Sequence, residues 1–178
     1  STEWWYEVSL LSADGEFRRP IGQVGIGFWF NDERYGVARA AENGWELATA
    51  TLSDPVLKVL FYESDLYAEI DDDSSLSISN VVLLPNTQQL ILQINVKGDP
   101  DNTRHLFRLW LTDDLASAEQ VELLWTGKNN VGIGYSPDGR YLLIADYNFA
   151  SSNGEYSQYL LDLETLQVSE PILSRGFG

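Results

Sequence analysis

One short sequence occurs twice in this chain, 107 residues apart. The first copy, VGIGFWFNDERYGVARA, begins at Val24, and the second, VGIGYSPDGRYLLIAD, begins at Val131. Each copy has a short apolar segment with two glycines, then a compact polar turn, then a second segment in which apolar residues recur. Apolar residues with a period of two predict β-strands, and turn residues between such segments predict hairpins. The chain is therefore expected to repeat one antiparallel β-unit.

The unit that contains the second copy is the easiest to delimit. Pro137, Asp138 and Gly139 predict its first turn, because Pro presets φ, Asp bonds nearby backbone and Gly accepts positive φ. The segments RYLLIADYN, SQYLLDLE and QVSEPIL then supply three further strands. This unit has four antiparallel strands and spans residues 130–174.

The rest of the chain divides in the same way. Residues 23–63 contain four alternating segments separated by the turns NDE, NG and SDP, and residues 76–125 contain four more. Residues 1–22 align with the last two strands of the unit at 130–174. The sequence thus predicts a single all-β domain, residues 1–178, of about three and a half four-stranded units. No helix longer than one or two turns is expected.

Each part of the unit has an expected place in the packing. The glycines of the two VGIG segments would allow neighbouring backbones to approach closely, namely Gly25, Gly27, Gly132 and Gly134. Alternating apolar residues of the second and third strands would pack one unit against the next. These packing residues are Val37, Leu90, Leu92, Leu142, Ile144, Leu161 and Leu163.

The repeat resembles the blades of β-propellers, in particular the WD40-like (PD40-like) repeats of TolB-type propellers. The resemblance rests on SPDGRYLLI at 136–144 and on YLLDLET at 159–165. The units at 23–63 and 76–125 share only the turns and the alternation. Similar blades form the propeller of prolyl-oligopeptidase-like peptidases, and the motif does not separate these families.

The number of units has a consequence for assembly. Propellers close their ring with about four to eight blades. Three and a half blades leave an incomplete ring, and the open end exposes an apolar sheet face to water. We therefore expect a missing segment of a longer chain, or another chain in an oligomer, to complete the ring. A β-sandwich is the alternative fold.

The charge of this acidic protein restricts its partners. It has 27 acidic and 11 basic residues, a formal net charge of −16. Such a surface repels nucleic acid and anionic membranes, and it favours basic protein faces or metal cations. There is no run of 18 apolar residues, so no membrane insertion is expected.

Few residues are available for catalysis. The chain has no Cys and one His, His105. Without Cys, disulfides and thiolate chemistry are excluded. One His and no Cys are too few ligands for a typical zinc site. The sequence also has no G-x-S-x-G motif, which would supply a nucleophilic serine to act with the histidine. We therefore expect a protein that is not an enzyme. The lack of Cys is compatible with a bacterial protein exported to the periplasm or secreted, and the cytoplasm is the alternative location.

Two kinds of candidate site remain. An exposed Trp would stack on a sugar or anchor a protein partner, unless it packs between blades; the candidates are Trp4, Trp5 and Trp29. Acidic loops would hold Ca²⁺ through oxygen ligands, unless they are simply solvated; the candidates are Asp71, Asp72, Asp73, Asp99 and Asp101. No other cofactor is expected.

These features together predict a non-catalytic binding or scaffold module that mediates protein–protein interaction or assembly. Two alternatives stay open. One is the propeller domain of a larger, prolyl-oligopeptidase-like hydrolase. The other is a propeller that binds a sugar or another small ligand.

Overall fold

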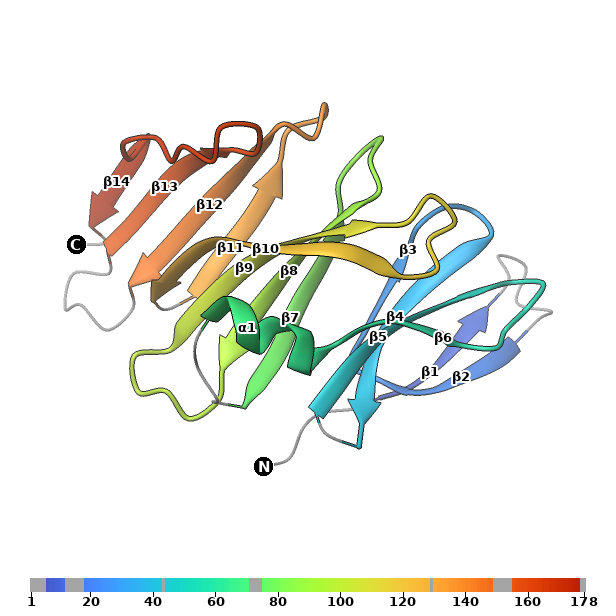
Figure 1. Cartoon of the computed structure of the whole chain (residues 1–178). Coiled ribbons are helices and arrows are strands. Elements are labelled where there is room, and N and C mark those ends of the chain that lie inside the picture. Colours follow the sequence, from blue (N-terminus) through green and yellow to red (C-terminus); the bar gives the residue numbers. More distant parts are fainter. Residues whose placement is uncertain are drawn as a thin grey trace. The chain divides into compact units, whose positions relative to one another are not determined.

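The chain folds into separate antiparallel sheets that follow one another in sequence (Figure 1). The computed structural model describes residues 6–11, 18–42, 44–70, 75–128, 130–148 and 155–176. Within these residues, one sheet has two strands and three sheets have four, and the strands of each sheet are ordered as they are in the chain. The predicted all-β fold class is thus confirmed.

The first two sheets belong to one compact unit, Ser1–Asp73 together with Leu111–Glu119. The two-stranded sheet pairs β1 (Tyr6–Leu11) with β2 (Arg18–Val24). The first four-stranded sheet contains β3 (Ile26–Trp29), β4 (Arg34–Ala41), β5 (Gly44–Thr51) and β6 (Lys58–Tyr62).

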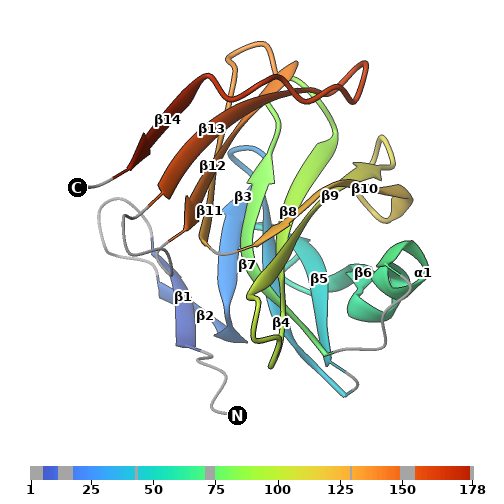
Figure 2. The same ribbon diagram turned by 90° about the vertical axis from the view of Figure 1, so that its left-hand side faces the viewer.

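The two-stranded sheet packs on one face of β4 and β5. Val24 of β2 lies in a buried cluster with Tyr35 and Val37 of β4 and with Ala48 and Ala50 of β5. Tyr35 pairs with Ala50 and Val37 with Ala48, so all four side chains share one sheet face. The period-two alternation therefore places the core of this unit on that face. Figure 2 shows β1 and β2 beside β3 and β4.

A short helical segment follows β6. It consists of η1 (Glu63–Leu66) and α1 (Tyr67–Ile70), which lie next to β6 in Figure 2. The buried carboxylate of Glu63 connects this segment to the β4–β5 hairpin. The backbone N–H of Trp45 donates to Glu63 Oε2 (3.1 Å), and the Tyr67 hydroxyl donates to Oε1 (2.8 Å). Sequence alternation cannot reveal a link that depends on one buried acid.

The other two sheets belong to a second compact unit, Ser74–Trp110 together with Gln120–Gly178. Its first sheet contains β7 (Leu76–Leu83), β8 (Gln89–Val96), β9 (Thr103–Leu111) and β10 (Ala118–Lys128). Its second sheet contains β11 (Asn130–Tyr135), β12 (Tyr141–Asn148), β13 (Glu155–Asp162) and β14 (Leu173–Gly176).

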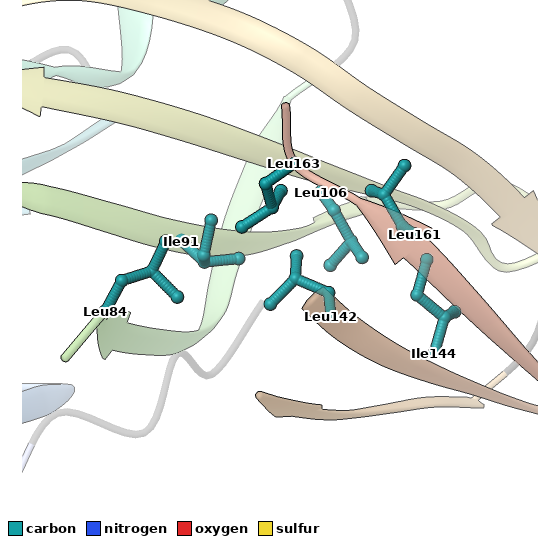
Figure 3. Close-up of a cluster of buried hydrophobic side chains, with 7 residues drawn as sticks. All are labelled: Leu84, Ile91, Leu106, Leu142, Ile144, Leu161 and Leu163. Carbon is teal, nitrogen blue, oxygen red and sulfur yellow. The ribbon is translucent and has the colours of Figure 1, made fainter. Parts of the chain in front are cut away.

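An apolar seam joins these two sheets face to face. Figure 3 shows its side chains meeting between the sheets; they are Leu84, Ile91, Leu106, Leu142, Ile144, Leu161 and Leu163. Each is 5% exposed or less. All seven packing residues predicted from the sequence are buried, and four of them lie in this seam. Leu90 and Leu92 point to the opposite face of β8, because their neighbour Ile91 faces the seam.

The crowding expected at the VGIG glycines is absent at two of the four, Gly27 and Gly134. Among the described residues, a Cβ on Gly27 would meet no atom within 4 Å, and one on Gly134 would meet only Leu143 Cβ at 3.8 Å. The glycine that is crowded in the first hairpin is Gly36, where a Cβ would collide with the Phe28 ring.

The seam predicts unequal effects for two adjacent leucines of β13. Leu161→Ala should lower the free energy of unfolding by about 2–5 kcal/mol, because it removes buried methyl groups and leaves a cavity. Leu160→Ala should cost less than about 1 kcal/mol, because Leu160 lies on the other face and is 37% exposed. Urea unfolding of both variants measures the difference, and equal losses would contradict this assignment of faces.

Candidate functional site

A depression lies at the turn between β3 and β4. Trp29, Phe30, Asn31 and Asp32 line it, and its volume is about 420 Å³. The Trp29 side chain is 51% exposed. The structure thus places this predicted residue in the wall of an open surface hollow, whereas Trp4 and Trp5 lie outside the described residues. A binding role for the three tryptophans stays a prediction.

Two aromatic ring pairs hold the side chains that line this depression. Trp29 pairs across the hairpin with Tyr35, and the two rings meet edge to face at 5.9 Å and 65°. Tyr35 is buried in the core cluster of the unit, so it anchors the partner ring. Phe28 and Phe30 form a second edge-to-face pair at 5.1 Å, and Phe28 covers Gly36. Such pairs add stability beyond the area they bury. Trp29 is therefore presented on a packed base.

Asn31 shapes the turn itself. Its Oδ1 accepts hydrogen bonds from the backbone N–H groups of Glu33 and Arg34, both at 2.9 Å. Asp138 has the same role in the second VGIG hairpin, where its Oδ1 accepts from the N–H of Arg140 at 3.1 Å. Asn and Asp are favoured in turns because their side chains bond the backbone in this way.

The positively charged side chain next to this turn, Arg34, donates hydrogen bonds to main-chain carbonyl oxygens. Arg34 Nη1 donates to the carbonyl oxygens of Asp114 (2.6 Å) and Leu115 (3.1 Å) in the β9–β10 turn. Hydrogen bonds, first from the Thr112 side chain and then from the Ala116 N–H, hold the pKa of Asp114 below its usual value, and the Arg34 charge adds to this effect. Asp114 is therefore anionic at neutral pH.

Carboxylates outnumber bases around the depression. Asp32 lines it, and Glu33 follows in the same turn. The β5–β6 turn, which carries Asp54, reaches this turn because the Leu52 N–H donates to the Glu33 carbonyl at 2.8 Å. With Asp114, four acidic residues lie on the connected turns that hold Arg34. The local field is therefore negative, as is the net charge of the chain.

Hydrogen bonds within the acidic loop between β8 and β9 use the carboxylate of Asp99 as their acceptor. The Asp99 carboxylate accepts from the backbone N–H groups of Thr103 (2.8 Å) and Asp101 (3.0 Å). Hydrogen bonding, first from the Thr103 side chain, lowers the pKa of Asp99. Asp101 pairs with Lys128 at 2.5 Å.

The predicted calcium ligands are placed only in part. Across the described ranges, no group of three or more side chains capable of holding a metal ion occurs. The other candidates, Asp71, Asp72 and Asp73, lie outside those ranges. Calcium binding therefore stays a prediction.

The ion pair of a buried arginine was not anticipated from the sequence. Arg108 of β9 is buried, and its Nη2 lies 2.5 Å from Glu122 Oε2. Its Nη1 donates to the carbonyl oxygen of Leu163 at 2.7 Å, across the seam between the two sheets of this unit. The guanidinium also lies 4.2 Å from the centre of the Trp110 ring. Arg108 thus satisfies a backbone acceptor at one end of the apolar seam.

The single histidine is part of the same sheet. His105 is buried on β9, and its Nδ1 lies 2.9 Å from the Thr126 hydroxyl of β10. Its ring packs against Phe107 with the centroids 5.9 Å apart.

One carboxylate beside the seam has an unsatisfied oxygen. Asp146 follows Ile144 by two residues on β12, so both face the seam. Its Oδ1 is buried and has no hydrogen-bond partner. Burial raises the pKa of Asp146 above its ordinary value. In contrast, hydrogen bonding from Arg140 lowers the pKa of Asp162.

These opposite shifts predict opposite pH dependences. A raised folded-state pKa means that the contribution of Asp146 to stability falls as pH rises from about 3.9, the ordinary Asp value, through the folded-state pKa. Asp146→Asn should therefore raise the urea midpoint at pH 7, and the gain should disappear in acid.

Asp162→Asn is the matched control. Its folded-state pKa is depressed, so the stability that it contributes is present above the ordinary Asp pKa and is lost as pH falls through the folded value. This variant should lower the urea midpoint at pH 7 and match the wild type in acid. Parallel pH profiles for the two variants would contradict the assigned environments.

No helix of the described residues has the length and apolar character needed to cross a membrane.

Comparison with known proteins supports the fold. No family profile and no curated protein matches the sequence. The chain is similar to a solved structure from a structural and mechanistic study of two prolyl endopeptidases, with a TM-score of 0.56 and 14% sequence identity. The match covers 96% of this chain and 26% of that one, so this chain spans about a quarter of its length. The matching region is the β-propeller domain of that enzyme, and the sheets described above are accordingly propeller-like blades.

Proposed function

We propose that this protein is a non-catalytic β-propeller module that binds a further β-sheet through the open face of its last blade. The observation that supports this is unequal burial of the two faces of neighbouring sheets. In β8 the side chains on both faces are buried, including Leu90, Ile91 and Leu92. In β12 and β13 the seam face is buried, whereas Leu160 on the opposite face is 37% exposed.

This open face, called here the terminal face, consists of Tyr141, Leu143 and Leu160. Leu143 and Leu160 are directly paired across β12 and β13, so their side chains form one apolar surface. Tyr141 and Leu143 are half-buried. An apolar sheet face gains free energy when another sheet covers it, at about 25 cal/mol per Å² of apolar area. A further sheet with alternating apolar residues is the complementary occupant.

Charged residues flank the terminal face. Arg140 Nη2 lies 2.9 Å from Asp162 Oδ2 and 3.4 Å from Glu164 Oε2, and its guanidinium lies 5.1 Å from the centre of the Tyr141 ring. Exposed ion pairs of this kind contribute little to affinity. Binding would therefore derive mainly from the apolar residues, and the charged rim would favour one register of the incoming sheet.

The partner in this proposal is a second copy of the chain or a further segment of the same polypeptide. Either would continue the stacking of blades. In the isolated chain, the available partner is a second copy.

Substitution in the terminal face tests this proposal. Leu160→Lys places a charge at its centre and should weaken self-association by at least about tenfold in dissociation constant. The matched control is Leu166→Lys, which alters an exposed leucine in the β13–β14 loop and should leave association unchanged. Sedimentation equilibrium measures both. The proposal fails if the wild-type chain stays monomeric and also does not bind the rest of any longer polypeptide that its gene encodes.

A second candidate is the propeller domain of a larger hydrolase. It is supported by the similarity to a prolyl endopeptidase, whose chain is about four times as long as the region matched. In this proposal the further sheets belong to the same polypeptide, and the catalytic residues lie in another domain.

The genomic reading frame tests the second candidate. It should continue into an α/β-hydrolase sequence with a G-x-S-x-G nucleophile elbow followed by an acid and a histidine. A frame that encodes only propeller blades would refute this candidate and leave the binding module in place.

A further inference from the structure

We propose that the Trp29 depression binds an arginine or lysine side chain from a partner peptide. This inference rests on the proposed function, because it adds a second contact site to the same binding module. The site is the hollow of about 420 Å³ lined by Trp29, Phe30, Asn31 and Asp32. That volume is at the lower end of the range for ligand pockets, about 300–1,000 Å³, and suits one side chain.

An open aromatic face is the first requirement. Trp29 is 51% exposed. Gly27, two residues earlier on the same face of β3, has open space where a side chain would be. A cation can therefore approach along β3 to the Trp29 ring. Trp is the aromatic side chain that attracts cations most strongly.

Charge complementarity is the second requirement. Asp32 lines the hollow, and Glu33, Asp54 and Asp114 lie on the turns connected to it. Arg34 offsets only one of these four negative charges, and its guanidinium is directed to the carbonyl oxygens of Asp114 and Leu115. A cation would thus find an aromatic face and a nearby carboxylate together.

Preorganisation is the third requirement. Tyr35 is buried and supports the Trp29 ring edge to face. Asn31 fixes the turn through two backbone hydrogen bonds. Little conformational freedom remains to be lost on binding, which favours affinity in a shallow site.

The third full blade provides an internal control. Tyr135 pairs with Leu142 at the end of β11, as Trp29 pairs with Tyr35 at the end of β3. Tyr135 is 48% exposed, close to the value for Trp29. Its turn contains one acid, Asp138, and one base, Arg140, which is paired with Asp162, whereas the turn after Trp29 contains the two acids Asp32 and Glu33. Tyr135 therefore offers an equally exposed ring without the same surplus of carboxylates.

Neutral sugars also stack on exposed Trp, so they are the competing ligand class. Stacking of a sugar does not require a carboxylate surplus, whereas binding of a cation gains from it. The charges around Trp29 favour the cation.

Titration with a defined peptide tests the inference. The probe is acetyl-Gly-Arg-Gly amide, and the neutral control is the same peptide with citrulline in place of arginine. Nuclear magnetic resonance should show the Trp29 indole signal shifting with the arginine peptide and not with the citrulline peptide. Added salt should weaken binding, because the attraction is partly electrostatic.

Variants separate the contributions of the ring and the carboxylate. Trp29→Ala should weaken binding about tenfold, and Trp29→Tyr less. Asp32→Asn should weaken it about threefold while keeping the aromatic ring. Tyr135→Ala and Glu170→Gln, which remove an exposed ring and an exposed charge elsewhere, should leave the affinity unchanged. The resonance spectrum of each variant checks that it is folded.

Several results would overturn the inference. These are equal binding of the citrulline peptide, absence of any shift at Trp29, loss of binding in Tyr135→Ala, or binding of cellobiose without binding of the arginine peptide. The self-association of the same variants is measured separately. Loss of the peptide site with intact association refutes only this inference, whereas intact peptide binding without any association refutes the terminal-face proposal.

Discussion

Face-to-face packing of twisted sheets through alternate residues is the interaction on which this structure depends. A strand shows its side chains to two faces in turn, so a sheet between two neighbours must be apolar on both. β8 is apolar on both faces, since Leu90, Ile91, Leu92 and Ile94 are all fully buried. In β12 and β13 the apolar residues Leu142, Ile144 and Leu161 of the seam face are buried, whereas Leu160 on the opposite face is 37% exposed. The terminal face is thus the side of β12 and β13 that the seam does not cover.

The same packing determines the state of the polar groups within it. Arg108 and Asp146 both border the apolar seam, yet their environments differ. The Arg108 guanidinium has Glu122, the Leu163 carbonyl and the Trp110 ring as partners, which offset the loss of water. One oxygen of Asp146 is buried without a partner, so burial disfavours its charge and raises its pKa. A single interface therefore contains one satisfied and one unsatisfied ionisable group.

The two proposed contact surfaces use different physical forces. The terminal face offers apolar area, which favours a broad and sheet-like partner. The Trp29 depression offers one aromatic ring within a negative field, which favours a small cationic group. Because these surfaces lie on different sheets and depend on different residues, substitutions in one leave the other intact. A module of this kind can be held in an assembly by one surface and contact a basic segment through the other.

The amino-acid sequence by itself determined the strand order and most of the strands and turns, because period-two alternation and turn chemistry are local. It misplaced the last strand, which was expected at QVSEPIL, whereas β14 is Leu173–Gly176. It offered Trp29, Trp4 and Trp5 as equivalent candidates and did not distinguish among them. It did not determine the strand register of the hairpins. When the two sequence copies are aligned with their offset of 107 residues, Trp29 aligns with Ser136. In the structure the residue equivalent to Trp29 at the end of the strand is Tyr135. The Phe30 N–H bonds the Arg34 carbonyl and the Ser136 N–H bonds the Tyr141 carbonyl, so the first turn is one residue shorter. Three further features likewise depend on tertiary structure. Arg108 contacts Leu163, and Glu63 bonds the β4–β5 hairpin, although these groups are distant in sequence. One oxygen of Asp146 is buried without a partner, which depends on how the sheets pack.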